Sequence, residues 1–462
     1  MNARDGARAG ALVFVLIAVG WLFATRDRVN PSAFGYDFVA FYCGASVAVA
    51  GADPYHTEPL RTCEHRVGRQ FRPDSRLVVP APLPGYALAF VAPLTRLPYP
   101  LALALWSALL LASYVVCVVT LARLSGLSQP LVAAATLLSL GVVSLFLGQL
   151  VPIALAALCL AARAIERERP YVATAWCALA MLEPHLALPA IAALFLARPA
   201  TRVPLALALC VLAAVSLALL GPAVNLEYLT RVLHAQVGSE IARADQLSPV
   251  ALAYRFGLNE NAAVTLGGVT YALAAALGVL LGIIAVRRSG ALAALVLVPP
   301  AIALLGAPYV HVQHLAFALP AALFLLGRTE WKTPALLAVF LLTIPWVVPY
   351  DATPLVPFAA LVVAFLACGL LKLSPLRGAA LGLVVAAIVF AIGASLAPHV
   401  PPPPSAYAGV ADGDLAEAGW RILIAAGFHD DVPLLTALAL PAWAALLALV
   451  VAAASTRSSH AA

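Results

Sequence analysis

The sequence predicts an all-α polytopic membrane protein, in which one integral membrane domain covers residues 1–462 and about 10–14 helices cross the bilayer. The first observation behind this prediction is composition, since 63% of the residues are hydrophobic and only 10% are charged. A soluble globular domain is about 45–50% apolar and about 25% charged, so this chain has too little polar surface to face water. The second is patterning: Ala, Leu and Val form long unbroken runs, whereas the strands of an outer-membrane barrel alternate apolar and polar residues.

The positive charge of the chain orients the expected spans. The net charge is +6, and nearly all of the 27 basic residues are arginine. Basic residues prefer cytoplasmic loops, which explains the excess without a nucleic-acid partner. An arrangement with both termini in the cytoplasm of a bacterial-type plasma (inner) membrane places these basic clusters inside. The clusters are Arg123, Arg163–Arg169, Arg198–Arg202, Arg287–Arg288, Arg328–Lys332, Lys372–Arg377 and Arg457.

The first element along the chain is the apolar run Ala11–Phe23, which we expect to be an uncleaved first span. It leads into a first extracytoplasmic loop over residues 25–80, where Val39–Val49 is expected to form a short helix that ends at Gly51. Pro80–Pro93 is apolar but rich in proline and only about half a bilayer long, so it could be re-entrant, interfacial or a short span.

The later runs leave one alternative open and end in a polar loop. Tyr171–Leu182 and Leu186–Leu196 are short for separate spans, and they could instead form one long helix kinked at Pro184. The last extracytoplasmic loop, residues 397–431, contains consecutive prolines that are typical of a stiff extended spacer. The acids after these prolines are expected in a solvated linker with a short helix. They are Asp412, Asp414 and Glu417.

Two of the seven cysteines, Cys43 and Cys63, lie outside the long apolar runs. They could form a disulfide if the first loop faces an oxidising compartment, or they could remain free thiols. The sequence has no C-x-x-C motif, so a structural zinc site of that type has no support.

Polar residues at the ends of the apolar runs gather on the face opposite to the basic clusters. The inner loops contain little but charge, and the sequence has no Gly-rich phosphate cradle of the kind that ATP-driven proteins use. Any chemistry is therefore expected on the extracytoplasmic face. The residues concerned are Asp37, Gln149, Glu183, His185, Ser248, His311, His314 and Asp351.

Several motifs follow one another through residues 1 to about 330. They are Asp37 with Phe41-Tyr42, Gly51-x-Asp53-Pro54-Tyr55, the proline-rich segment Pro82–Pro100 followed by Trp106, Leu147-Gly148-Gln149 before an apolar run, and Ala307–His314. In this order and spacing they resemble glycosyltransferase family 87. Its members are multi-pass enzymes of the GT-C class, typified by polyprenol-phosphate-mannose-dependent α-mannosyltransferases. The resemblance implies a GT-C-like bundle of transmembrane helices with a helical first extracytoplasmic loop.

The chain departs from the family pattern at a few positions. Members usually carry Lys-Pro where this chain has Glu183-Pro184, and Ser where it has Ala307. The common Asn near Gly-Gln is replaced by Val151-Pro152. If the family Lys binds a lipid phosphate, then His185 or an arginine would have to take over that role here.

The resemblance also implies a mechanism, in which an acid of the first outer loop acts as general base. Asp37 matches that position. The base removes a proton from the acceptor hydroxyl, which attacks the anomeric carbon of the sugar and displaces a lipid phosphate. A carboxylate at the edge of a low-dielectric wall has a raised pKa, which suits a base. From its residue type alone, Asp37 could instead be an N-cap at the start of its helix.

Other polar residues are candidates for binding the substrates. Asp53 precedes a proline, which is typical of a turn, and Glu183 could make a structural hydrogen bond. His311 and His314 are expected to share a helix face, where they could donate to phosphate, ligate a metal or form an interfacial pair. The candidates are Tyr36, Tyr42, Asp53, Tyr55, Gln149, Glu183, His185, His311 and His314.

A phosphate leaving group needs positive charge or N–H donors beside it. The arginines of the first outer loop and of the loop Pro222–Ala262 are the candidates. No cofactor is certain from the sequence, and a divalent metal stays open. These arginines are Arg61, Arg66, Arg69, Arg72, Arg76, Arg231, Arg243 and Arg255.

The expected function is transfer of a hexose, with mannose as first candidate, from a polyprenyl-phosphate-sugar donor to a glycan or lipid acceptor outside the cytoplasm. Membrane lipids are the other expected partner. A multi-pass transporter or lipid flippase without transferase chemistry is the alternative, and a structural membrane subunit is a third. A transporter predicts discontinuous helices near the middle of the membrane, whereas the polar residues here lie at the outer ends of the spans.

Overall fold

The described part of the chain is helical. Within it no strand is found apart from two isolated backbone bridges, so the all-α prediction is confirmed. The expected first span Ala11–Phe23, the proline run, Asp351, Asp412, Arg72 and Arg76 lie outside the described residues. The computed structural model describes residues 34–69, 77–139, 141–241, 243, 246–329, 331–343, 377, 411, 413–426 and 432–456.

Three of the described helices are long and apolar enough to cross a membrane: α5 (Tyr99–Ser125), α11 (Pro199–Glu227), which continues to Ile241, and α14 (Glu260–Ser289). Helix α11 leaves apolar side chains largely exposed, with Val203 at 69% and Leu207 at 62%. An apolar surface this extensive is unfavourable in water but not in a bilayer. The membrane class is confirmed, whereas the number of spans stays a prediction.

Shorter, alanine-rich helices form the core of the bundle. Every residue of α15 (Ala294–Ala303) is buried. Small residues allow this close packing, since a Cβ added at Gly278 of α14 would lie 2.8 Å from the carbonyl oxygen of Pro299. The other helices of the bundle are α6 (Gln129–Leu138), α7 (Gly141–Leu147), α8 (Val151–Glu166), α9 (Pro170–Ala180), α10 (Pro184–Ala197), α16 (Ala318–Leu326), α17 (Lys332–Leu342) and α21 (Val432–Ala454).

A turn at residues 181–183 separates α9 from α10. Glu183 has non-helical backbone angles, with φ −122° and ψ 77°, and Pro184 is the first residue of α10. Proline is favoured at the start of a helix because its missing N–H is not needed there. The alternative of one long helix kinked at Pro184 is therefore wrong, and the turn presents Glu183 between two helix ends.

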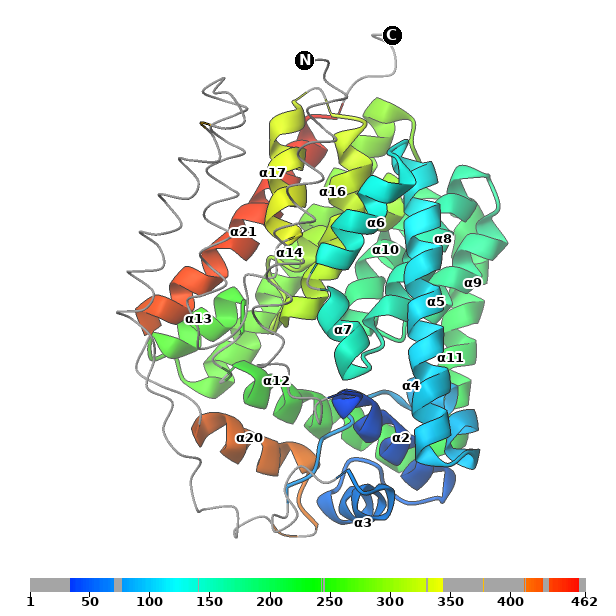
Figure 1. Ribbon diagram of the computed structural model, residues 1–462, viewed down its shortest axis with the longest axis vertical. Helices are drawn as coiled ribbons and strands as arrows, with labels where there is room; N and C mark the ends of the chain where they lie inside the picture. Colours follow the sequence, from blue (N-terminus) through cyan, green and yellow to red (C-terminus); the bar gives the residue numbers. More distant parts are fainter. Residues whose placement is uncertain are drawn as a thin grey trace.

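A second group of helices lies crosswise at one end of the bundle (Figure 1). It contains α2 (Tyr36–Val49), α3 (Thr57–Val67), α12 (Leu233–Ile241) and α20 (Ala416–Ala426). We call these four helices the crosswise layer. Next to it are α4 (Gly85–Val91), η3 (Ala92–Arg96), the π-helical turn η4 (Tyr228–Val232) and α13 (Pro249–Arg255), whereas η5 (Val312–Phe317) packs against α7, α8, α15 and α16 of the bundle.

The open alternatives for Pro80–Pro93 are resolved in part. The chain is extended up to Pro84 and then forms the seven-residue helix α4, which is too short to span a membrane. Helix α4 packs against α2 and against α11, so this segment joins the crosswise layer to the bundle.

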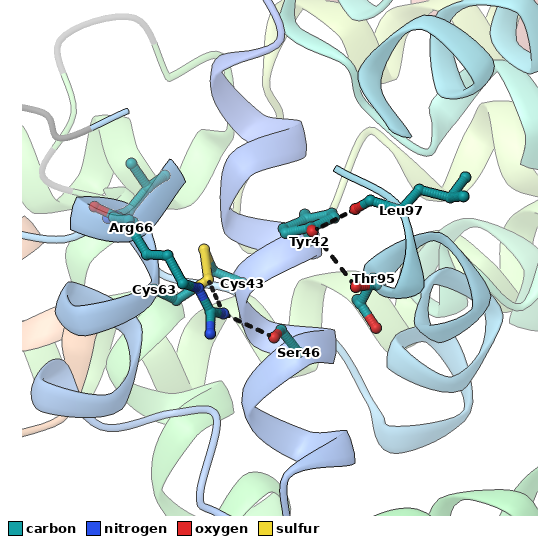
Figure 2. Close-up of a disulfide and its surroundings, with 9 residues drawn as sticks. Tyr42, Cys43, Ser46, Cys63, Arg66, Thr95 and Leu97 are labelled. Carbon is teal, nitrogen blue, oxygen red and sulfur yellow. Dashed lines mark hydrogen bonds between the residues drawn. A yellow bond between two sulfur atoms is a disulfide. The ribbon is translucent and has the colours of Figure 1, made fainter. Parts of the chain in front are cut away.

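A disulfide between Cys43 and Cys63 ties α2 to α3 (Figure 2). Beside it Arg66 donates a hydrogen bond to Ser46 Oγ at 3.2 Å. On the other side of α2, the Tyr42 hydroxyl donates to the carbonyl oxygen of Leu97 at 2.8 Å. The question between disulfide and free thiols is thus settled in favour of the disulfide.

The segment before α20 returns to the first loop and pairs with it. The backbone N–H of Thr57 donates to the carbonyl of Asp414, and that of Ala416 donates to Tyr55, both at 2.9 Å. Helix α20 also packs against α12, which buries Glu417 to 1% exposure. The expectation of a solvated Glu417 is therefore wrong, because long-range pairing draws this acid into the layer.

Candidate active site

A cavity of about 930 Å³ lies between the crosswise layer and the bundle. Residues from α2, α7, α10, α11, α12, η5 and α20 line it, so it is assembled from segments spread over most of the chain. Asp37, Gln149 and His314 all line this one cavity. The polar residues that the sequence places at the ends of separate apolar runs are therefore brought together.

Asp37 and Gln149 meet on the side that we call the α2 wall, which also includes Tyr36. Gln149 Nε2 donates a hydrogen bond to Asp37 Oδ2. Two tight turns allow this approach: Gly35 has φ +70° and Gly148 has φ +81°, and a Cβ on Gly148 would lie 2.9 Å from the Cβ of Phe38. Only glycine fits both the backbone angle and the space at residue 148.

The structure contradicts the interpretation of Asp37 as an N-cap. Helix α2 is capped by Gly35 in the left-handed region, with no side-chain hydrogen bond at the cap. Asp37 lies in the first helical turn, and its carboxylate faces the cavity. The Asp37 side chain is thus available for a role other than capping the start of the helix.

The surroundings of Asp37 raise its pKa to about 6 from an ordinary value of 3.8. Burial is the main cause, since it disfavours the charged form, while the hydrogen bond from Gln149 and the charge of Arg243 oppose it. A carboxylate with this pKa is mostly ionised at neutral pH and is a stronger base than an exposed aspartate.

Glu240 of α12 is a second buried acid on the cavity. Its carboxylate accepts hydrogen bonds from Gln236 at 3.2 Å, from Gln246 at 3.1 Å and from His311 Nε2 at 3.1 Å. Arg243 Nε lies 3.5 Å from the same carboxylate, and Arg243 also lines the cavity. This network fixes a cation and a histidine close to the α2 wall.

Another part of the lining carries the histidines, and we call it the histidine wall: Glu183, His185, Tyr309, His311 and His314. The rings of His185 and His314 have centroids 4.9 Å apart, and those of His311 and His314 are 5.2 Å apart. His185 Nδ1 lies 3.9 Å from Glu183 Oε2. Two distant segments of the chain, residues 183–185 and 309–314, therefore place their polar side chains within reach of one ligand.

Helix α11 gives the cavity an apolar side. Leu209, Leu212, Ala213 and Leu217 line it, and the same helix exposes other apolar side chains on its outer surface. The helix is broken at Gly221, where Asn225 donates to the carbonyl oxygen of that glycine. The cavity thus combines a polar region with a wall that belongs to a lipid-facing helix.

Not every candidate from the sequence lines the cavity. Tyr36, Gln149, Glu183, His185, His311 and His314 do, whereas Tyr42, Asp53 and Tyr55 do not. Asp53 Oδ1 accepts the backbone N–H of Tyr55 at 2.9 Å, which is the turn expected for Asp-Pro. The Tyr55 hydroxyl donates to the carbonyl of Leu83, so it supports the extended segment before α4.

Among the described phosphate candidates, Arg243 lines the cavity and the other arginines lie elsewhere. Arg61 pairs with Glu58 at 2.5 Å and Arg231 with Glu227 at 2.6 Å. Arg255 donates to the backbone carbonyls of residues 243 and 246, so it shapes the loop that carries Arg243. Arg66 lies beside the disulfide, and Arg69 stands 5.9 Å from the ring centroid of Tyr99.

Sequence reasoning missed Glu240, Gln236 and Trp420, which also line the cavity. The spacing of Gln236 and Glu240, four residues apart, is a signal for a polar pair on one helix face. Trp420 approaches the α2 wall from the far end of the chain, with its ring centroid 6.5 Å from that of Tyr36. No local pattern indicates that contact.

Comparison with known proteins adds one finding. Residues 84–308 match the family model of glycosyltransferase family 87, which confirms the resemblance seen in the motifs. The matched region contains Gln149, Glu183, His185 and Arg243, whereas Asp37 and His314 lie outside its two ends. No curated protein and no solved structure matches the chain.

Proposed function

We infer the function from the premise that this chain is a membrane glycosyltransferase with a family 87 region over residues 84–308. We propose that it transfers a hexose, with mannose as the first candidate, from a polyprenyl-phosphate-sugar donor to an extracytoplasmic acceptor. The observation that carries the proposal is a carboxylate, Asp37, facing a cavity that also contains Arg243 and an apolar wall from a lipid-facing helix.

In the proposed mechanism Asp37 is the general base. It takes the proton of the acceptor hydroxyl, which attacks the anomeric carbon and releases the lipid phosphate. The raised pKa of Asp37 supports this role, because a base works best when its pKa lies near the operating pH. Gln149 orients the carboxylate through its hydrogen bond.

The leaving phosphate needs a cation in a poorly solvated site. Arg243 meets this need from the loop after α12, and its backbone is held by Arg255. The apolar wall of α11 would take the first isoprene units of the donor, since that side of the cavity is lined by leucine and alanine.

Two features support an extracytoplasmic site. The disulfide of the crosswise layer fits an oxidising compartment, since disulfides are rare in the reducing cytosol. The basic clusters of the sequence favour the opposite side of the membrane for the inner loops. A lipid-linked donor fits this topology, because nucleotide sugars are confined to the cytoplasm.

The test is an assay of the purified chain with radiolabelled polyprenyl-phosphate hexoses, comparing wild type with Asp37→Asn. Loss of a general base typically lowers the rate by about 10²–10⁴, while Asn keeps the size and the thermal stability. Asp53→Asn is the matched control, because Asp53 does not line the cavity and Asn can keep its turn. Retained transfer in Asp37→Asn would refute the role of Asp37, and movement of the labelled lipid across vesicles without any transfer would favour a flippase.

A further inference from the structure

The histidine wall contains polar atoms without a hydrogen-bond partner in the described part of the chain. The Glu183 side chain makes no hydrogen bond to a described residue, and its Oε2 lies 3.9 Å from His185 Nδ1. The other ring nitrogen, His185 Nε2, is buried and has no hydrogen-bond partner among the described residues. Buried polar atoms without partners are rare and costly, so a ligand that satisfies them is expected here.

The arrangement of these groups is that of a metal site. One ligand atom from each of Glu183, His185 and His314 lies within 4.8 Å of the other two. Two imidazoles and one carboxylate form a donor set that binds zinc and its first-row neighbours, with bonds of about 2.0–2.2 Å. We propose that Glu183, His185 and His314 form a binding site for a divalent transition metal of the zinc class.

The backbone around these three residues is fixed before any metal arrives. The Tyr271 hydroxyl donates to the carbonyl oxygen of His185, and Pro184 sets the turn that carries Glu183. His314 Nδ1 accepts the N–H of His311 at 3.3 Å, a long hydrogen bond that metal coordination through either ring nitrogen would replace.

The charge of the cavity favours a cation at this position. The described lining contains three carboxylates, Asp37, Glu183 and Glu240, against one guanidinium, Arg243. Arg243 is already paired with Glu240. A divalent metal at Glu183 offsets the remaining negative charge, and it can add attraction for a phosphate. This last role rests on the proposed function, whereas metal binding itself does not.

A second group of possible ligands, Asp53, His56 and Glu227, is less suited to hold a metal. Glu227 is paired with Arg231 at 2.6 Å, and His56 Nδ1 lies 2.7 Å from the carbonyl oxygen of Gly413. These groups are partly exposed and already have partners. They provide the control for the experiment.

The experiment uses the full chain in detergent, without a polyhistidine tag, stripped with a chelator and titrated with Zn²⁺ and Co²⁺. We expect one equivalent of metal by elemental analysis, a visible Co²⁺ absorption band and a higher melting temperature with metal. Loss of a residue that only hydrogen-bonds to a metal ligand lowers metal affinity by about 10–100-fold. Glu183→Gln and His185→Ala remove ligands themselves, so they should weaken metal binding by more than this. Glu183→Gln preserves shape, so the melting temperature of its metal-free form should match wild type.

Two controls locate the metal. His56→Ala removes the second group, and His234→Ala removes a surface histidine of α12 that does not line the cavity. Both should bind metal like wild type. Loss of binding in His56→Ala, or unchanged binding in Glu183→Gln and His185→Ala, would overturn the proposed site.

Transfer assays separate this inference from the proposed function. If the protein binds one metal ion at the three residues but transfers no sugar, the metal site is supported and the proposed function is contradicted. If the metal-free protein transfers sugar at the full rate, the proposed function is supported and the role of the metal at the phosphate is contradicted.

Discussion

The acids on the two walls of the cavity, Asp37 and Glu183, differ in whether a described residue gives them a hydrogen bond. On the α2 wall, Asp37 accepts a hydrogen bond from Gln149, and its helix is cross-linked by the disulfide. On the histidine wall, Glu183 and His185 Nε2 have no hydrogen-bond partner among the described residues. Both walls are built from tight turns at helix ends, so the difference lies in their side-chain partners and not in the kind of backbone.

This contrast matches two different tasks. A general base must be held in one orientation, because small displacements of a reacting group are costly in rate. A ligand site must keep its donors free until the ligand arrives. We therefore expect changes on the α2 wall to act on the reaction or on the fold, and changes on the histidine wall to act on binding.

Apart from Asp37, Arg243 offers the largest expected effect, since its charge acts on Asp37 and it is the described arginine on the cavity. Arg243→Ala should lower sugar transfer by about 10²–10³, the usual cost of removing one donor to a developing oxyanion. Arg231→Ala is the matched control, because Arg231 is 64% exposed and lies outside the lining. The measurement is the initial rate with a labelled polyprenyl-phosphate hexose, and equal rates for both variants would remove Arg243 from the reaction.

The disulfide tests whether the α2 wall is rigid because it is cross-linked. Cys43→Ser opens a loop with a sequence separation of 20, and we expect a loss of about 3 kcal/mol in the free energy of unfolding. The measurement is thermal or denaturant unfolding with and without reductant. With reductant, the free energy of unfolding of the wild type should fall to that of the variant. The free energy of unfolding of the variant should not change with reductant. A reductant effect on Cys43→Ser would contradict this account.

We expect Gln149 to lower the pKa of the proposed base, Asp37, so its loss should shift the pH dependence of the rate. The wild-type rate should rise with pH through about 6, because Asp37 must lose its proton to act as a base. The hydrogen bond from Gln149 lowers the pKa of Asp37, so Gln149→Leu should raise it and move the acid limb to higher pH. The rate above the new limb should fall less than tenfold, within the range of one lost hydrogen bond. If the acid limb of the pH–rate profile does not move, Gln149 does not affect the pKa of the catalytic base.

The smallest expected effect on sugar transfer concerns Glu64 of α3, behind the α2 wall, which acts on the stability of the fold. Burial raises its pKa to about 8 from an ordinary 4.5, although Oε1 accepts the N–H of Val79. The Glu64 carboxyl ionises at lower pH in the unfolded chain than in the folded one. The folded state therefore loses stability as the pH rises from 4.5 to 8. Glu64→Gln should match wild type at pH 4 and melt at a higher temperature above pH 8, because one pKa unit corresponds to about 1.4 kcal/mol and the amide carries no charge to desolvate. Parallel melting curves across pH would show that Glu64 is not buried in solution.

The class of the protein and some of the candidate site residues could be predicted from the sequence alone. Composition and unbroken apolar runs predict a helical membrane protein, because a bilayer selects for apolar helices whatever their packing. Motif order led to the family, and the position of Asp37 after the first apolar run pointed to a candidate base. Each of these signals is local, or depends on order along the chain, and so it is visible in one sequence.

Only the tertiary structure decided which residues meet. Gln149 reaches Asp37 across 112 residues, Trp420 reaches Tyr36 from the far end of the chain, and Glu417 is buried by pairing with the first loop. Arg243, among many arginines, is the one that lines the cavity in the described chain. Helix periodicity shows which residues share a face, but the packing of distant helices and the turns between them fix where that face lies. For this reason the polar residues could be found from the sequence, whereas their partners could not.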